Sequence, residues 1–227
     1  MTRLPVPSSP STAALAQAVP WFPVTGGLVG GLAGLAGWWA RGAIGVSASA
    51  FLTVAVGLLI TGALHEDGLA DTFDGLGAGG GRSAMLEVMA DSRVGVYGVA
   101  ALILAVGLKA SLLAALLDDR LVLVTCVAAG VSRACAVTMM KVFPPAKDSG
   151  LVADLSRSLS SSRALVTALV GAGVAALLGW PQALAALVGW TAALLVGLWA
   201  RRRIGGLTGD VVGAMVVVSE LGVLTLA

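Results

Sequence analysis

The sequence has 227 residues, of which 58% are hydrophobic and only 11% are charged, and its formal net charge is +2. A soluble globular domain carries about 25% charged residues, so this chain has too few to cover a surface that faces water. The small net charge also excludes a nucleic-acid-binding protein, because tracking phosphates requires a basic face. We therefore expect one all-α domain over residues 1–227, a polytopic helical bundle embedded in a membrane.

Seven apolar segments are long enough to cross the hydrocarbon core of a bilayer, which takes about 17–25 residues per helix. They cover residues 24–40, 44–64, 97–117, 121–140, 164–180, 182–200 and 210–227. The connections at 41–43, 118–120 and 181 are short, so we expect antiparallel helical hairpins there.

Basic residues divide unequally between the two sides that seven spans define. Ten lysines and arginines fall in the N-terminal tail and the loops 65–96, 141–163 and 201–209, against two in the opposite connections. Because loops rich in Lys and Arg stay in the cytoplasm, we predict that the three long loops are cytoplasmic. The protein is then an integral protein of the bacterial inner membrane, in contact with membrane lipid.

The first predicted span carries glycines four residues apart, at Gly26, Gly30 and Gly34. Such a stripe lets helices approach closely in lipid, so we expect packing inside the bundle, with a homo-oligomer interface as the alternative. Cys126 and Cys135 lie in one apolar stretch, a pattern that indicates neither a disulfide framework nor a zinc site.

The segment 65–96 holds six acidic residues against two arginines. Asp67, Asp71 and Asp74 project from one face if the second helix continues through them. Carboxylates so close repel one another, and a hard divalent cation, Mg²⁺ or in its place Mn²⁺, relieves the repulsion. Glu66 lies about 100° away around such a helix, where it reaches a second ion or a donor behind the first. The alternative is a solvated acidic helix end.

The stretch 75–80 fits G-x-G-x-x-G, but it follows an acidic helix end and not a strand, which argues against a dinucleotide site. We expect a mobile glycine loop whose backbone N–H groups face a phosphate. The cations Lys147, Arg157 and Arg163 are candidates for binding phosphates, with lipid headgroups as the alternative partner.

Four charged residues lie within or at the ends of later spans. Asp210 opens the last predicted span at the membrane depth of Asp67, which places it in reach of the same ion. An unpaired charge inside a span is expensive. We therefore expect Lys109, Arg133 and Glu220 to pair with one another or to face a polar cavity.

The runs 64–75 (LHEDGLADTFDG) and 91–98 (DSRVGVYG) closely resemble the cobalamin synthase family (adenosylcobinamide-GDP ribazoletransferase). The segments 2–7 and 205–210 look like the N- and C-terminal signatures of that family, so the resemblance spans almost the whole chain. It implies a membrane enzyme of the last step of cobalamin nucleotide-loop assembly. Such an enzyme joins adenosylcobinamide-GDP to α-ribazole or its 5′-phosphate, releases GMP and requires Mg²⁺.

The resemblance also implies roles for individual residues. Carried over by position, the metal-site candidates are Glu66, Asp67, Asp71, Asp74 and Asp210. The catalytic candidates are Asp74, Asp91 and Arg93, with Asp74 or Asp91 accepting the proton of the ribazole hydroxyl. The candidates for binding the substrates are Arg3, Lys147, Arg157 and Arg163, although the family pattern is only partly present in 141–150.

Two other functions deserve comparison with this one. CDP-alcohol phosphotransferases also use aspartates at helical spacing. Their pattern, however, requires an aspartate at the position of Leu64 and the pair Ala-Arg at positions 71–72. An ion-coupled transporter would explain charges inside spans, but it places its acids near the membrane midplane. The acidic cluster here lies at a membrane face.

Overall fold

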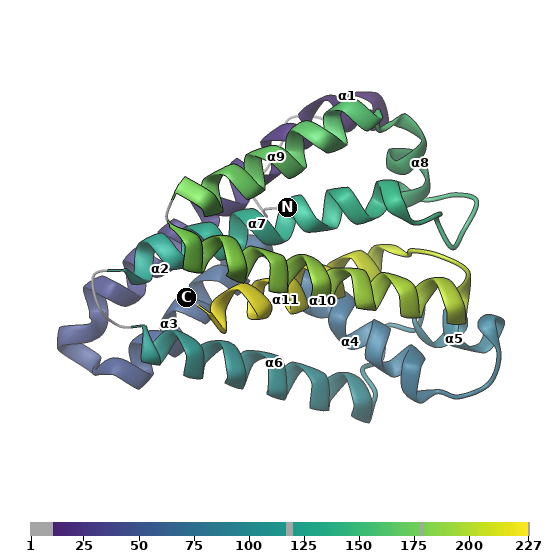
Figure 1. The fold of residues 1–227 in the computed structure, drawn as a ribbon. Coiled ribbons are helices and arrows are strands. Elements are labelled where there is room, and N and C mark those ends of the chain that lie inside the picture. Colours follow the sequence, from purple (N-terminus) through teal and green to yellow (C-terminus); the bar gives the residue numbers. More distant parts are fainter. Residues whose placement is uncertain (1–10, 117–119, 178, 227) are drawn as a thin grey trace.

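The computed structural model shows a bundle of helices (Figure 1). It describes residues 11–116, 120–177 and 179–226, so the family-like segment 2–7 and most of the predicted 118–120 turn lie outside the described residues. Within those ranges the extended pairing is limited to one isolated bridge, between Pro145 and Leu207. The prediction of an all-helical fold is confirmed for the described part of the chain.

Each of the seven predicted spans coincides with a helix whose ends differ by a few residues. The described helices are α1 (Thr12–Ala18), the 3₁₀ turn η1 (Val19–Trp21), α2 (Phe22–Ile44), α3 (Val46–Thr61), α4 (Leu64–Gly77), α5 (Arg82–Val88), α6 (Val96–Ala115), α7 (Leu121–Val142), α8 (Leu151–Ser158), α9 (Ser161–Leu177), α10 (Trp180–Ile204) and α11 (Gly209–Leu224). The helices that match predicted spans are α2, α3, α6, α7, α9, α10 and α11.

The described residues contain four to six candidate membrane spans, against the seven predicted. The continuous stretch Thr12–Ile44 and helices α6, α7 and α10 are each long and apolar enough to cross on their own. The bent pairs α3–α4 and α8–α9 bring the number to six if each pair is one span. Helix α11 has 16 residues, which rise only about 24 Å against a hydrocarbon core of about 30 Å. The described chain thus supports four to six crossings.

The second predicted span does not continue into the acidic helix. Helix α3 ends at Thr61, and Gly62 and Ala63 both adopt left-handed conformations, with φ of 68° and 56°. Left-handed residues cannot propagate a right-handed helix, so the chain turns and α4 runs at 93° to α3. The condition that the second helix continues through the motif is not met, although Asp67, Asp71 and Asp74 still share one helix, α4.

The helix ends gather at two opposite ends of the bundle (Figure 1). The C-terminal ends of α4, α7 and α10 lie at the right of this view, near α5 and α8. The C-terminal ends of α2, α6 and α9 lie at the left. The long, basic connections that follow α4, α7 and α10 therefore lie at one end of the bundle.

Helix α7 lies at the centre of the bundle, where it packs against α2, α9, α10 and α11. Glycines of α2 allow the closest of these approaches: a Cβ on Gly26 would lie 2.6 Å from the Ala129 carbonyl oxygen, and one on Gly30 would overlap the Thr125 carbonyl. The glycine stripe is therefore used for packing inside the bundle. Cys126 and Cys135 are free thiols, as expected.

The glycine-rich stretch 75–80 begins in a helix, although its composition indicates a loop. Gly75 and Gly77 belong to the last turn of α4, and each makes room for a large side chain. A Cβ on Gly75 would lie 2.6 Å from Met89 Cγ, and one on Gly77 would overlap the Tyr97 ring. Tertiary packing thus outweighs the low helix propensity of glycine, and the turn begins only after α4.

Candidate active site

Helix α4 carries the aspartates of the acidic motif, and α11 brings a further aspartate to the same place. Asp71 lies within electrostatic reach of Asp67, Asp74 and Asp210, which all carry its own charge. Asp67 is exposed and Asp71 is half-buried. The structure therefore gathers residues that are more than 130 positions apart in the sequence.

Two glycines make this gathering possible, because they let α4 and α11 cross in close contact. A Cβ on Gly68 would lie 2.7 Å from the Asp210 carbonyl oxygen, and one on Gly213 would lie 3.1 Å from the His65 carbonyl oxygen. Thr208 caps α11: its hydroxyl oxygen accepts from the Val211 amide at 3.2 Å and lies 3.3 Å from Asp210 Oδ2. The cap fixes the first turn of α11 and with it the position of Asp210.

Lys147 is the predicted substrate-binding cation that lies at this crossing. Its positive charge acts on Asp210. The backbone of its loop is tied to the residues before α11, since the Ala146 amide donates to the Leu207 carbonyl at 2.8 Å and the Leu207 amide donates to the Pro144 carbonyl at 2.9 Å. Lys147 and Asp210 are therefore held by one small piece of paired backbone.

Arg82 of α5 is an organising residue that the sequence did not reveal. Its guanidinium donates from Nε to the Ile204 carbonyl at 2.8 Å and from Nη2 to the Ala146 carbonyl. It thereby joins the segment after the acidic helix to the Lys147 loop and to the C-terminus of α10. A cation also interacts favourably with the carbonyl end of a helix. The only sequence signal was an arginine near the acidic motif, which by itself names no partner.

Asp74 makes contacts that differ from those of a free metal ligand. Its side chain is buried, and its two oxygens accept from the Gly95 amide at 2.7 Å and the Gly98 amide at 2.8 Å. These amides begin α6, so Asp74 caps that helix and locks α4 to α6. The predicted catalytic and metal-binding residue is thus engaged structurally through both carboxylate oxygens.

Asp91 and Arg93 form an exposed ion pair beside a wide cavity of about 490 Å³ that Asp74 and Tyr97 also line. Arg93 Nη2 lies 2.6 Å from Asp91 Oδ2, and the Arg93 amide donates to Oδ1 at 3.0 Å. These hydrogen bonds lower the pKa of Asp91 to about 2. Since a general base works best with a pKa near the working pH, Asp91 is better suited to holding Arg93 than to accepting a proton.

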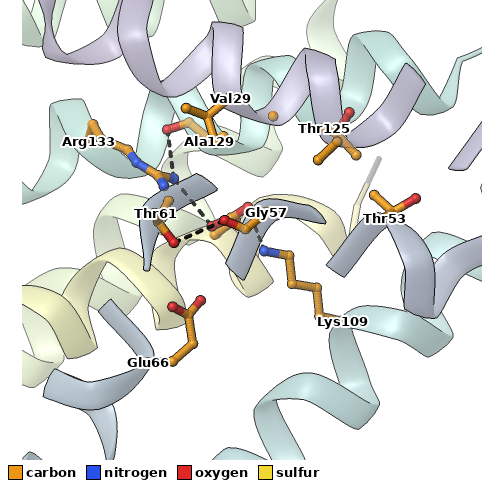
Figure 2. Close-up of a pocket in the computed structure, with 12 residues that line it drawn as sticks. Val29, Thr53, Gly57, Thr61, Glu66, Lys109, Thr125, Ala129 and Arg133 are labelled. Atoms are coloured by element: carbon orange, nitrogen blue, oxygen red, sulfur yellow. Dashed lines mark hydrogen bonds and ion pairs between the residues drawn. The ribbon is translucent and has the colours of Figure 1, made fainter. Parts of the chain in front are cut away.

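Glu66 points into a cavity that none of the aspartates lines, and Figure 2 shows its carboxylate directed toward the labelled residues of that cavity. It lines an internal cavity together with Lys109, Arg133 and Glu220, and the charges that act on it are those three. Lys109 Nζ lies 2.9 Å from Glu220 Oε1, and Arg133 Nη1 lies 3.3 Å from Glu220 Oε2. Of the two alternatives expected for Lys109, Arg133 and Glu220, pairing is confirmed, and the paired groups also line this cavity. The acidic motif is divided between two sites.

The remaining substrate-binding candidates do not meet the aspartates in the structure. Arg157 pairs with Asp154 within α8 and donates to the Asp148 carbonyl at 2.9 Å. Arg163 lies in the first turn of α9. Helix α8 packs mainly on α1 and α7, whereas α4 packs mainly on α5, α6 and α11. Arg3 lies outside the described residues.

The aspartates at the α4–α11 crossing have the donor chemistry of a magnesium site. Asp67, Asp71 and Asp210 present carboxylate oxygens whose charges repel one another, which a hard dication relieves. Among the described residues no three His, Cys, Asp or Glu side chains stand in a metal-holding geometry. The residues therefore fit Mg²⁺ in donor type, and holding it requires their side chains to draw together.

Known proteins resemble this chain over its full length. A family model described as cobalamin-5-phosphate synthase matches residues 1–227. An adenosylcobinamide-GDP ribazoletransferase of Bradyrhizobium diazoefficiens is 43% identical over 233 aligned positions, which cover 100% of this chain and 89% of the relative. Relatives of the same name are 37% identical in Roseiflexus sp. (100% and 87% covered) and 41% identical in Rhizobium meliloti (78% and 71% covered). No solved structure matches the chain. The chain belongs to the cobalamin-5-phosphate synthase family.

Proposed function

We propose that this protein is an adenosylcobinamide-GDP ribazoletransferase. It joins adenosylcobinamide-GDP to α-ribazole or its 5′-phosphate and releases GMP. The observation that carries the proposal is the gathering of Asp67, Asp71 and Asp210 at one end of the bundle in a chain whose full-length relatives bear this name. The full-length match favours this activity over a CDP-alcohol phosphotransferase or a transporter.

Asp67, Asp71 and Asp210 would hold Mg²⁺, or Mn²⁺ in its place. When bound, the ion neutralises charge on the pyrophosphate that is cleaved. Lys147, whose charge acts on Asp210, is placed to bind a phosphate oxygen of either substrate. Asp74 fixes the start of α6 through the Gly95 and Gly98 amides and so keeps α4 in place.

Arg93 is the second cation that the proposal assigns to the substrates. Its side chain is 87% exposed, and Asp91 orients it through a bidentate pair at the rim of the 490 Å³ cavity. An arginine in this arrangement presents its remaining donors to an anionic group. Arg3, Arg157 and Arg163 would then meet phosphates or lipid headgroups farther from the aspartates.

The membrane arrangement follows from the distribution of basic residues. Residues 1–227 would form one domain in the bacterial inner membrane, with the loops after α4, α7 and α10 in the cytoplasm. Both the nucleotide-bearing substrate and GMP are then handled on the cytoplasmic side. A measurement of the mass of the protein in detergent shows whether it forms a homo-oligomer.

The proposal is tested by following GMP release from adenosylcobinamide-GDP and α-ribazole with purified protein in lipid nanodiscs. We expect turnover that requires Mg²⁺ and that Asp71→Asn abolishes, with thermal stability close to that of the wild type. Glu87→Gln is the matched control, since it removes an exposed acid of the same segment, and it should leave turnover intact. Equal turnover by wild type and Asp71→Asn would refute the assignment of Asp71.

A further inference from the structure

An internal cavity collects charged side chains that the proposed chemistry does not use. Glu66 of α4, Lys109 of α6, Arg133 of α7 and Glu220 of α11 line a space of about 30 Å³, together with threonine hydroxyls (Figure 2). Two carboxylates and two cations sum to zero formal charge. Four helices from distant parts of the sequence therefore meet around acidic and basic side chains whose formal charges cancel.

Glu220 is shared between both cations. Its Oε1 pairs with Lys109 Nζ at 2.9 Å and its Oε2 pairs with Arg133 Nη1 at 3.3 Å. Arg133 Nη1 also donates to the Ala129 carbonyl at 3.1 Å and to Ser132 Oγ at 3.0 Å. One carboxylate thus faces two cations, which leaves a positive charge in the interior for another group to balance.

Glu66 can balance that charge because its side chain lines the same cavity and one of its carboxylate oxygens has no hydrogen-bond donor within the described part of the chain. Its Oε2 is enclosed and accepts no hydrogen bond from any described residue. The side chain points toward the other residues that Figure 2 labels around the cavity. An enclosed carboxylate oxygen without a donor costs free energy, so a partner in the cavity is expected.

We propose that this cavity binds one or two water molecules that bridge Glu66 to Lys109, and that Glu66 is a positioning residue and not a metal ligand. The cavity volume of about 30 Å³ exceeds the roughly 10–15 Å³ that one water needs by this measure. A water there accepts a hydrogen bond from the Lys109 ammonium, which has three N–H groups and gives one to Glu220. It donates to Glu66 Oε2.

The threonines complete the hydrogen-bonding of such a water. Thr61 Oγ1 donates its proton to the Gly57 carbonyl at 3.0 Å, and Thr125 Oγ1 donates to the Leu121 carbonyl at 2.9 Å. Each hydroxyl oxygen therefore faces the cavity only as an acceptor. Because the formal charges of the two carboxylates and the two cations cancel, the lining as a whole favours an ion of neither sign, and a neutral donor fits it.

The bridge also affects the aspartates that α4 and α11 carry. Glu66 precedes Asp67 in the chain, and Glu220 and Asp210 share α11. A water bridge from Glu66 to Lys109, and onward through Glu220, thus fixes both helices that carry the aspartates. The predicted effect of the bridge on catalysis rests on the proposed function. Its predicted effect on the stability of the fold does not rest on that function.

A charge-balance cycle tests the bridge without metal or substrate. Glu66→Gln leaves Lys109 and Arg133 facing Glu220, a net charge of +1, and Lys109→Met leaves −1; the double variant is neutral. We expect each single variant to lower Tm by several degrees and the double variant to regain most of the loss. Lys109→Met with Glu87→Gln is the matched control and should regain nothing. Additive losses in the double variant would overturn the proposal.

Binding of Mn²⁺, followed by its electron paramagnetic resonance signal, separates the two roles of Glu66. A positioning residue leaves the Mn²⁺ dissociation constant of Glu66→Gln within about twofold of wild type while turnover falls about tenfold, and Lys109→Met then restores turnover in part. Weaker Mn²⁺ binding by tenfold or more in Glu66→Gln would instead make it a ligand. If the wild-type protein binds no Mn²⁺, the proposed metal site is refuted. The comparison of Tm values among the charge variants still tests the water bridge in that case.

A third readout shows the water itself and does not depend on activity. A structure of the wild-type protein in nanodiscs, at a resolution that shows ordered water, should contain water between Glu66 and Lys109. A direct Glu66–Lys109 ion pair or a metal ion on Glu66 would overturn the proposal. If Glu66→Gln yields no folded protein, the neutral double variant decides: its folding supports the bridge, and its failure to fold contradicts it.

Discussion

Gly68 of α4 lies directly against Asp210 of α11: a methyl group on Gly68 would stand 2.7 Å from the Asp210 carbonyl oxygen and 2.9 Å from its Cα. Both neighbours are backbone atoms, so they cannot turn aside as a flexible side chain would. The close approach of the two aspartate-bearing helices therefore requires that neither position 68 nor position 213 carry a side chain. The site depends on this glycine more than on any local helix preference.

Gly68→Ala should separate α4 from α11. Overpacking of this kind costs about 1–3 kcal/mol, and the separation moves Asp210 away from Asp67 and Asp71, so turnover should fall with stability. Thermal unfolding and GMP release measure the two effects. Gly107→Ala on α6, where a Cβ would meet nothing within 4 Å, is the control and should leave both unchanged. A Gly68→Ala protein with wild-type turnover would contradict the tight crossing.

Asp74→Asn should lower stability, in contrast to Asp71→Asn. An amide side chain can accept from only one of the Gly95 and Gly98 amides, which leaves one buried donor without a partner at a cost of about 1–3 kcal/mol. Asp71 has three like charges near it, so its neutralisation should not destabilise the fold. Comparing Tm of the two variants without metal tests this, and equal Tm values would remove the capping role of Asp74.

The Asp91–Arg93 pair should titrate far below neutral pH. Because Arg93 lowers the pKa of Asp91 to about 2, the contribution of this pair to stability is present above about pH 4 and is lost as the pH falls through about 2. Arg93→Ala should return the pKa of Asp91 toward its ordinary value of about 3.9, as followed by NMR with labelled aspartate. Arg163→Ala should leave it unchanged. An Asp91 pKa insensitive to Arg93 would disprove the pairing.

Arg82→Ala should loosen the loops around Lys147 and the start of α11. Loss of the guanidinium removes the donor to the Ile204 and Ala146 carbonyls, so amide hydrogen exchange should rise at Ala146 and Lys147 and in 205–208. Turnover should fall about tenfold, as is common when a supporting contact is lost. Ser83→Ala alters the exposed neighbour and should change neither. Exchange rates equal to wild type in those two loops would exclude the organising role of Arg82.

The sequence by itself identified the helices that match its seven apolar segments, the acidic motif and the end of the bundle where the charges gather. These features are local or compositional: apolar length predicts a helix in a membrane, and aspartates at positions 67, 71 and 74 share a face of any helix. The cost of burying a charge alone predicted that Lys109, Arg133 and Glu220 pair or face a polar cavity, and the structure shows which of them pair. Family resemblance named the chemistry because its motifs are contiguous in the chain.

Tertiary structure decided how those residues divide into sites. Only the left-handed pair Gly62–Ala63 turns α4 away from α3, and only the crossing at Gly68 brings Asp210 to the acidic helix. The same packing gives Asp74 to the amides of α6 and turns Glu66 toward Lys109. Spacing along one helix fixes relative direction, but the partner in each direction comes from another helix, whose position depends on contacts distant in sequence.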